Sequence, residues 1–244
     1  MRSPSSSPAS AAPAPSSGLD TVLKAVLWDM DGTLVDTEPY WIAAETELVT
    51  SHGGHWGHEQ ALSLVGKALE DSAVVLQEAG VPWGIREIVD HLTERVIAQV
   101  RRELPWRPGA RELLADLHGA GVRCALVTMS EGPLAGEIAA SLPGPYFEFL
   151  VTGDQVSRGK PHPEPYLRAI ERLRATDPSL GAGNCVALED SVPGVASAVA
   201  AGLLTVGIAH HVPLDDDGGH VAWPTLAGRT TADLRALLSV EGGR

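Results

Sequence analysis

Four carboxylates follow the first apolar run of the sequence within a short distance of one another. They are Asp29, Asp31, Asp36 and Glu38, in the stretch AVLWDMDGTLVDTE. Carboxylates held close together in a partly buried place repel one another, so this spacing requires a compensating partner. Gly32 interrupts the series and permits a tight turn whose backbone N–H groups can face an anion. The stretch therefore combines crowded negative charge with a place for an anionic ligand.

Polar residues also end three later apolar runs. Thr128 and Ser130 follow the second run, Lys160 follows the third, and Glu189 and Asp190 follow the fourth. If the runs are parallel strands of one sheet, their carboxyl ends share an edge, and ligands bind where the strand order reverses. We therefore expect these side chains to converge with the first carboxylates. A hard divalent cation relieves the repulsion among them, and Mg²⁺ that also contacts a phosphate group fits best.

Each of these signals alone has an ordinary structural explanation. Asp, Gly and Thr are common in turns, and a lone lysine such as Lys160 is most often a solvated charge. Ser191 before a helix, with Pro193 in the first turn, is a usual helix start. The complete set, at the ends of four apolar runs, favours a functional site over these separate explanations.

The elements that position these residues alternate along the chain. Short apolar runs rich in β-branched or aromatic residues predict strands buried on both faces of a parallel sheet. They lie at 24–29, 122–128, 147–152, 184–189 and 203–209. Helical patterns lie at 109–119, 131–141, 163–175, 192–201 and 231–240. This order predicts an α/β fold with a doubly wound, Rossmann-like parallel sheet, and we expect the last helix to close an edge of that sheet.

An interruption of about ninety residues separates the first two predicted strands, which is too long for a simple crossover. Apolar residues recur at helical spacing from 85 to 100, and shorter helical patterns lie at 38–51 and 69–79. We therefore expect an inserted α-helical cap domain at 39–105. The α/β core then comprises 21–38 and 106–244, and residues 1–20, rich in Ser, Pro and Ala, form a disordered tail.

The composition is that of a globular protein with an acidic surface. A formal net charge of −13 over 244 residues argues against affinity for nucleic acid or anionic membranes. The chain has neither the apolar segment of a signal peptide nor a run long enough for a transmembrane helix, so we expect a cytoplasmic protein. Cys124 and Cys185 lie in apolar runs, which favours reduced core thiols over a disulfide or a metal site.

Four segments resemble, in order, the motifs of one enzyme superfamily. DMDGTLVDTE, LVTMS, GKPHPEPYL and ALEDSVPGVASAVAAG are similar to the first to fourth motifs of the haloacid dehalogenase (HAD)-like hydrolases. The resemblance extends from about residue 24 to residue 210. It is strongest to the branch of phosphatases and β-phosphoglucomutases that carries a helical (C1) cap, and it implies an Mg²⁺-dependent phosphoric monoester hydrolase.

The resemblance also implies a role for each core residue. Asp29 would attack phosphorus and form an aspartyl-phosphate, while Asp31 would protonate the leaving oxygen and later activate water. Thr128 and Lys160 would donate to the phosphoryl oxygens. The residues implied to hold Mg²⁺ are Asp29, Asp31 through its backbone carbonyl, Asp190, and Glu189 through a metal-bound water.

The cap should decide the substrate, because it covers the edge of the sheet and excludes water. The residues that we expect to bind substrate are Gly32, Glu38, Trp41, Lys67, Thr128, Met129, Ser130 and Lys160, with Gly66 and Leu69 beside them. Trp41 can equally be ordinary core, and Lys67 an ordinary surface lysine. The expected partner is a small phosphorylated metabolite, a sugar phosphate or similar monoester, with a nucleotide as the alternative.

The cap departs from those of several relatives. β-Phosphoglucomutases have a cap arginine and a cap histidine at the positions that match Leu69 and Trp41, and phosphonoacetaldehyde hydrolases have a Schiff-base lysine at the first of these. Dehalogenases lack the second acidic residue, here Asp31. The presence of Asp31 therefore favours phosphoryl transfer, and the absence of the cap arginine and histidine favours hydrolysis over a mutase. The alternatives are a phosphosugar mutase and a non-catalytic phospho-ligand-binding protein. We expect a monomer, with a dimer as the alternative.

Two His-rich segments have residue types that could bind a transition metal. SHGGHWGH holds His52, His55 and His58, and HHVPLDDDGGH holds His210 and His211 with three aspartates and a third histidine. Their Gly-rich context favours flexible solvent loops without a specific function.

Overall fold

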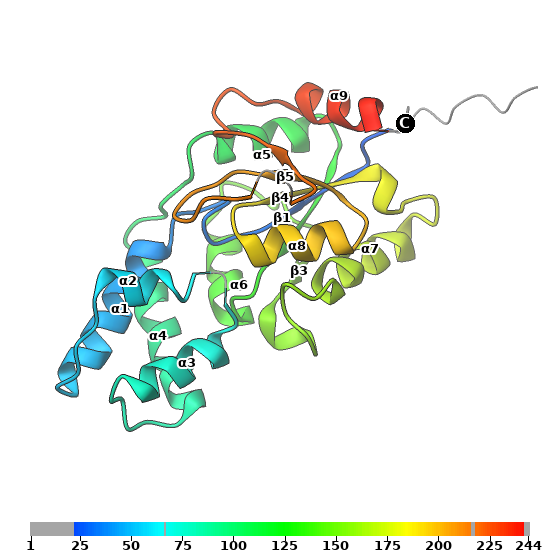
Figure 1. Cartoon of the computed structure of the whole chain (residues 1–244). Coiled ribbons are helices and arrows are strands. Elements are labelled where there is room, and N and C mark those ends of the chain that lie inside the picture. Colours follow the sequence, from blue (N-terminus) through cyan, green and yellow to red (C-terminus); the bar gives the residue numbers. More distant parts are fainter. Residues whose placement is uncertain (1–21, 66, 216–217, 242–244) are drawn as a thin grey trace, which may run out of the picture.

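The core of the protein is a parallel sheet with helices on both faces (Figure 1). The computed structural model describes residues 22–65, 67–215 and 218–241, so the predicted tail at 1–20 lies outside it. Within these ranges six strands pair in the order β3-β2-β1-β4-β5-β6. The strands are β1 (Ala25–Trp28), β2 (Arg123–Val127), β3 (Leu150–Val151), β4 (Cys185–Glu189), β5 (Leu204–Gly207) and β6 (Val221–Ala222). The predicted α/β doubly wound fold is confirmed.

The strand order reverses at β1, which lies between β2 and β4. Ala25 is in register with Arg123 on one side and with Cys185 on the other. In sheets of this type the crevice outside the carboxyl ends of the strands at the reversal is where ligands bind. The residues that directly follow β1 and β4 therefore occupy the position that the fold makes suitable for a ligand.

Alternate residues of β1 pack against helices on opposite faces. The core helices are α5 (Ala110–Gly119), α6 (Gly132–Ala140), α7 (Glu164–Thr176), α8 (Val192–Ala200) and α9 (Thr231–Glu241). Val26 and Trp28 belong to the apolar cluster that includes α5, α6 and α9, whereas Ala25 and Leu27 belong to the cluster with α7 and α8. All four are fully buried, and each large side chain contributes about 1.5–3 kcal/mol through its burial.

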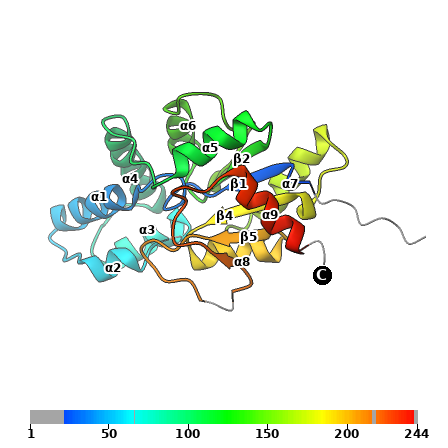
Figure 2. The same cartoon turned by 90° about the horizontal axis from the view of Figure 1, so that it is seen from above.

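The predicted position of the last helix was wrong. Figure 2 shows α9 over the same face of the sheet as α5, and not at an edge. Leu234 and Leu238 lie one turn apart and are buried in the cluster that contains Leu113 and Leu117 of α5. Their burial holds α9 on this face, and β6, a short strand that was not predicted, forms the edge instead. At the other edge β3 has two residues, fewer than the predicted strand at 147–152, and it pairs with β2.

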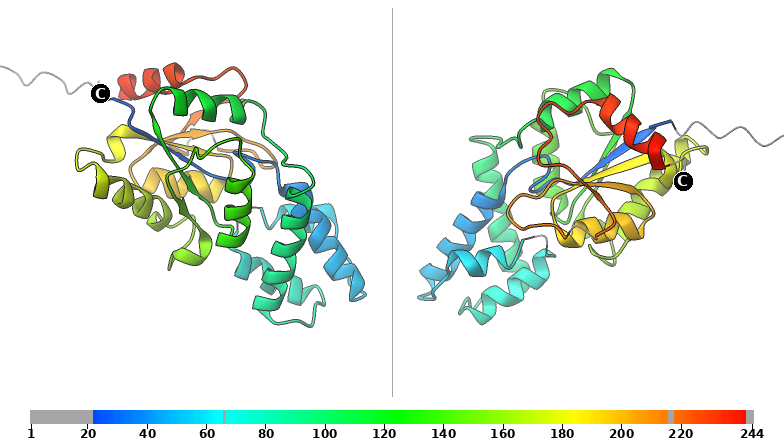
Figure 3. Two further views of the ribbon diagram at one scale, coloured as in Figure 1. Left: turned by 180° about the vertical axis from the view of Figure 1, so that it is seen from behind. Right: turned by 45° about the horizontal axis from the view of Figure 1, so that its top comes forward.

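Over its described residues, the insertion after β1 forms four helices, α1 (Glu38–Ser51), α2 (His58–Leu62), α3 (Leu69–Glu78) and α4 (Ile85–Val100). Both views in Figure 3 show them grouped beside the sheet as a cap. The helix α2 was not predicted, and the segment interpreted as a flexible loop, SHGGHWGH, ends at its first residue, His58. Trp56 just before α2 is buried at 7% exposure, and this anchors the segment that the glycines suggested was mobile.

Two connections and one side of α4 join the cap to the core. The connections are hydrogen bonded to each other, with Asp36 N donating to Pro105 O at 2.7 Å and Arg107 N donating to Leu34 O at 3.0 Å. Away from them, Arg86 of α4 donates two hydrogen bonds to Glu131, the residue before α6, at 2.6 and 2.7 Å. The cap is therefore held to the core at its connections and at α6.

Two further expectations can be compared with the structure. Cys124 and Cys185 are both free and buried, which confirms reduced core thiols. Among the described helices, none combines the length and the apolar character needed to cross a membrane.

Candidate functional site

The predicted substrate-binding residues surround one cavity between the cap and the carboxyl ends of the strands. The cavity has a volume of about 80 Å³. The predicted residues on its wall are Asp29, Asp31, Gly32, Glu38, Trp41, Lys67, Leu69, Thr128, Met129, Ser130, Lys160 and Asp190. The wall also includes residues that were not predicted, namely Glu45, Leu64, Val65, Ser72, Leu92, Ser191 and His211. Gly66 lies outside the described residues.

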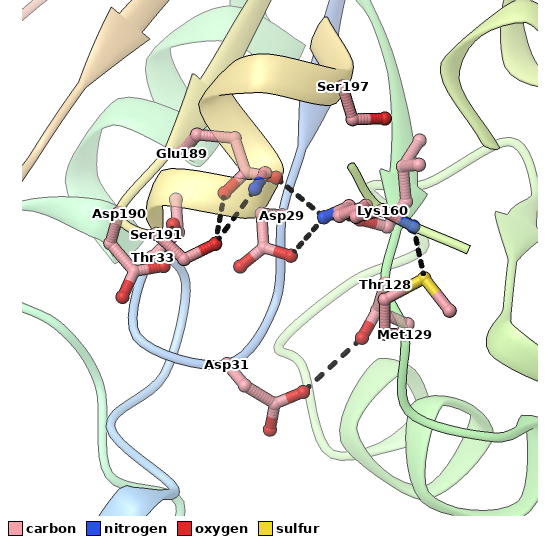
Figure 4. Close-up of polar contacts among 12 residues, drawn as sticks. Asp29, Asp31, Thr33, Thr128, Met129, Lys160, Glu189, Asp190, Ser191 and Ser197 are labelled. Atoms are coloured by element: carbon pink, nitrogen blue, oxygen red, sulfur yellow. Dashed lines mark hydrogen bonds and ion pairs between the residues drawn. The ribbon is translucent and has the colours of Figure 1, made fainter. Parts of the chain in front are cut away.

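Lys160 is buried and binds three oxygens at the floor of this cavity (Figure 4). Its Nζ donates to Asp29 Oδ1 at 2.5 Å, to Glu189 Oε1 at 2.6 Å and to Val127 O at 2.9 Å. Burial alone would lower the pKa of Lys160, but Asp29 and Glu189 raise the pKa above its ordinary value, so the ammonium is charged. All three of its donors have acceptors, which fixes the position of the Asp29 carboxylate.

The carboxylates here carry more negative charge than Lys160 balances. Oxygens of Asp29, Glu189 and Asp190 lie within 4.8 Å of one another. Burial, followed by repulsion from Glu189, raises the pKa of Asp29 to about 7. Burial, followed by repulsion from Asp29, raises the pKa of Asp190 well above its usual range. Three buried oxygen donors with uncompensated charge are the donor set that a hard divalent cation such as Mg²⁺ requires.

Because residue 32 is a glycine and has no Cβ, the carboxylate of Asp190 can occupy the space beside it. The φ angle of Gly32 is +89°, and a Cβ there would lie 2.0 Å from Asp190 Oδ2. On its other oxygen, Asp190 accepts a hydrogen bond from Thr33 Oγ1 at 3.0 Å. The glycine of the first motif therefore allows the turn after β1 to pass directly against the carboxylate at the end of β4.

Glu189 lies behind Lys160 and not on the cavity wall. It is fully buried, and its Oε1 accepts from Tyr166 at 2.6 Å as well as from Lys160. Its Oε2 accepts from Ser191 Oγ at 3.3 Å. These contacts show that Glu189 orients Lys160 directly, and Tyr166, which was not predicted, supports Glu189. Ser191 also caps α8 by accepting from Gly194 N at 3.1 Å, so its ordinary explanation holds as well.

Asp31 points away from this cluster and toward the end of β2. Its Oδ2 accepts from Ser130 Oγ at 2.7 Å and from Thr128 Oγ1 at 3.2 Å. Its Oδ1 accepts from Thr37 Oγ1 and, at 3.5 Å, from Trp41 Nε1 of the cap. Asp31 is thus held across the cavity from Lys160, in contact with both the core and the cap.

The cap contributes an acidic face of α1 to the cavity. Burial and the nearby Asp31 raise the pKa of Glu38 to about 7, and burial and Glu38 raise the pKa of Glu45 to about 8. Trp56 Nε1 donates to Glu45 Oε2 at 3.2 Å. The one signal in the sequence for Glu45 was its spacing of seven residues from Glu38, which places both on one face of a helix.

The second His-rich segment lies against the site, contrary to the expectation of a solvent loop. His210 Nε2 and His211 Nε2 lie 3.0 and 3.2 Å from the same oxygen of Asp36, and both rings are partly buried. His211 also borders the cavity. Asp216 and Asp217 of this segment lie outside the described residues.

Comparison with known proteins identifies similar sequences and folds. The family model of the haloacid dehalogenase-like hydrolases matches residues 23–202. The chain is 32% identical over 194 residues to a phosphorylated carbohydrates phosphatase of Thermotoga maritima, covering 77% of this chain and 86% of the relative. It is 31% identical over 186 residues to hexitol phosphatase B of Escherichia coli, covering 75% and 82%.

A solved structure with a similar fold is CbbY of Rhodobacter sphaeroides in complex with phosphate. Its TM-score is 0.76 at 26% sequence identity, and the match covers 87% of this chain and 99% of CbbY. A second structure of CbbY, also with a TM-score of 0.76, holds xylulose-(1,5)bisphosphate.

Proposed function

The chain belongs to the haloacid dehalogenase-like hydrolase family, and we propose that it is an Mg²⁺-dependent phosphatase that hydrolyses a small phosphate monoester. The observation that carries the proposal is the arrangement of Asp29 and Asp31. One carboxylate is fixed beside Lys160, and the other is held across the same cavity by Ser130 and Thr128. A nucleophile and a proton donor on opposite sides of one cavity are what cleavage of a phosphate ester requires.

In the proposed reaction Asp29 is the nucleophile. Lys160 binds its Oδ1, so Oδ2 is the oxygen directed to phosphorus, and attack gives an aspartyl-phosphate. Asp29 and Asp190, with the backbone carbonyl of Asp31, would hold Mg²⁺, and Glu189 holds Lys160 beside Asp29. When bound there, Mg²⁺ would keep these carboxylates ionised and offset the charge of the phosphate.

Asp31 transfers the protons. In the first step it gives a proton to the oxygen of the leaving alcohol as the P–O bond breaks. In the second step it takes a proton from the water that attacks the aspartyl-phosphate, which releases inorganic phosphate and restores Asp29. Ser130, Thr128 and Thr37 donate to the carboxylate of Asp31 and hold it in place between the two steps.

The cap supports hydrolysis rather than the mutase alternative. Trp41 and Leu69 border the cavity, at the positions where the resemblance places the histidine and arginine of β-phosphoglucomutases. The relatives named above, a phosphorylated carbohydrates phosphatase and a hexitol phosphatase, support a sugar phosphate or sugar alcohol phosphate as substrate. A cytoplasmic location, a monomeric state with a dimer as the alternative, and the absence of binding to nucleic acid or membranes stay predictions from the sequence.

The test is release of phosphate from a panel of esters, with Mg²⁺ and with chelator. The panel contains p-nitrophenyl phosphate and common sugar phosphates, and Asp29→Asn is measured beside the wild type. We expect metal-dependent release by the wild type and loss of at least a hundredfold in Asp29→Asn, because an amide is a poor nucleophile. Phosphate release by Asp29→Asn at more than a few per cent of the wild-type rate would exclude the covalent mechanism. Transfer of phosphate to another position of a sugar, without release, would identify a mutase. Binding of an ester without turnover would indicate a binding protein.

A further inference from the structure

The half of the cavity formed by the cap carries carboxyl groups on one helix face. Glu38, Trp41 and Glu45 of α1 all border the cavity, and their spacing of three and then four residues places them on one side of the helix. Glu45 is 5% exposed and uses Oε2 to accept from Trp56. Its Oε1 has no hydrogen-bonding partner among the residues that the structure describes. A carboxyl oxygen without a hydrogen-bonding partner, on a residue that borders the cavity, is an acceptor available to a ligand.

Positive charge is scarce in the same half of the cavity. The remaining wall contributed by the cap is mainly apolar, with Leu64, Val65, Leu69, Leu92 and Ser72. Over the described ranges, Lys67 is the one cationic residue that the cap brings to this wall, and it is an exposed residue. On the core side, Lys160 donates its three hydrogen bonds to Asp29, Glu189 and Val127. A second anionic group on a substrate would therefore meet Glu38 and Glu45 without a buried cation to compensate it.

Neutral hydroxyl groups suit this wall better. A hydroxyl that donates to a carboxylate forms a charge-assisted hydrogen bond, which is roughly twice as strong as one between neutral groups. The C–H groups of a sugar or polyol can pack against Leu69 and Leu92, which lie on the same wall. The wall thus matches a chain or ring that has both hydroxyl and C–H groups.

Given the proposed phosphatase activity, on which this inference rests, we propose that Glu45 and Glu38 determine specificity by binding the hydroxyl groups of a sugar or polyol monophosphate and by disfavouring a second anionic group. Burial raises the pKa of Glu45 to about 8, so near neutral pH Glu45 is largely protonated and Glu38, with a pKa of about 7, supplies the negative charge. A protonated carboxyl group donates a hydrogen bond as well as accepting one, as a hydroxyl group does.

The first test compares two substrates that differ in one group. The kcat/KM of the wild type is measured on a hexitol monophosphate and on the same hexitol with a second phosphate at its other end. We expect the monophosphate to be preferred at least tenfold. Equal or faster turnover of the bisphosphate would overturn the specificity inference and leave the phosphatase intact. Failure to turn over any ester in the panel would overturn both.

The second test, made at pH 9 so that Glu45 is ionised, removes the charge of Glu45 without changing its shape. We expect Glu45→Gln to lose at least tenfold in kcat/KM on the hexitol monophosphate, mostly through a higher KM. The loss on p-nitrophenyl phosphate, which has no hydroxyl groups, should be at least three times smaller. The matched control is Glu59→Gln on the exposed surface of α2, with wild-type kinetics expected. An equal loss on both substrates, or no loss on either, would exclude Glu45 as a specificity residue.

Discussion

Arg86 of the cap and Glu131 of the core form a two-pronged ion pair, with N–O distances of 2.6 and 2.7 Å. Glu131 directly follows Ser130, which holds Asp31, and precedes α6. The pair therefore joins the first turn of the cap helix α4 to the loop that carries part of the site. The Arg86 side chain is 53% exposed, whereas that of Glu131 is 10% exposed, so the contact lies at the rim of the interface between cap and core.

From this contact we expect Arg86→Gln to weaken docking of the cap more than it weakens the fold. The KM should rise about three- to tenfold, while the free energy of unfolding should fall by only about 1 kcal/mol, because the arginine is half exposed. Steady-state kinetics and urea unfolding measure the two effects. The control is Arg95→Gln. The ion pair between Arg95 and Glu47 lies within the cap, so we expect this substitution to leave KM unchanged. A KM equal in both variants would show that the Arg86 pair does not hold the cap.

The buried carboxyl groups of the cap should make stability depend on pH. The pKa of Glu45 is raised from 4.5 to about 8, so between these values the native state binds more protons than the unfolded state. The free energy of unfolding should therefore fall as pH rises through this window, with a slope of up to about 1.4 kcal/mol per pH unit for one group. In Glu45→Gln the slope should be smaller, so the variant should exceed the wild type in stability at pH 8 and approach it at pH 5. Urea unfolding between pH 5 and pH 8 measures the free energy of unfolding of the wild type and of Glu45→Gln, with Glu59→Gln as the control. Parallel pH profiles of the wild type and Glu45→Gln would contradict the burial of Glu45.

Two glycines should respond in opposite directions to the same substitution. Gly32→Ala places a Cβ at a φ of +89° and 2.0 Å from Asp190 Oδ2, so we expect a loss of activity and a stability lower by at least about 1 kcal/mol. Gly136→Ala lies inside α6 with no atom within 4 Å of the added Cβ, so stability should rise by about 0.5–1 kcal/mol. Thermal unfolding and phosphate release measure both. An active, stable Gly32→Ala would contradict the close approach of the turn to Asp190.

Mg²⁺ should stabilise the folded protein through Asp190. At a concentration one hundred times its dissociation constant, a ligand of the native state adds about 2.7 kcal/mol to the free energy of unfolding. We expect Mg²⁺ to raise the melting temperature of the wild type and to have a much smaller effect on Asp190→Asn, where one of the three clustered carboxylates is lost. The control is Asp71→Asn, at an exposed position of α3. A shift with Mg²⁺ that is equal in Asp190→Asn would place the metal elsewhere.

The chemistry of the core site could be predicted from the sequence because a parallel sheet brings the carboxyl ends of its strands together. Each of Asp29, Thr128, Lys160 and Asp190 lies near the carboxyl end of an apolar run, and parallel pairing places such ends at one edge. The structure places these four residues around one cavity. Among the described residues, every α-helix except α2 was also predicted, since apolar residues recur in them at a period set by the backbone itself.

The remaining features depended on contacts between segments far apart in the chain. Tyr166 supports Glu189 across a buried hydrogen bond, and its spacing in the sequence contains no sign of that contact. The face of the sheet that α9 covers follows from where Leu234 and Leu238 find a buried place. His210 and His211 lie against Asp36, although the composition of their segment predicted a solvent loop.

Sequence alone thus determined the α/β class, three of the inserted helices and the core carboxylates, because periodicity and strand ends are local properties of the chain. Only the tertiary structure decided that Glu45 faces the cavity, that Glu189 lies behind Lys160, and that Arg86 reaches the core. Burial, pKa and charge balance depend on what packs around a group, and packing is a property of the whole fold.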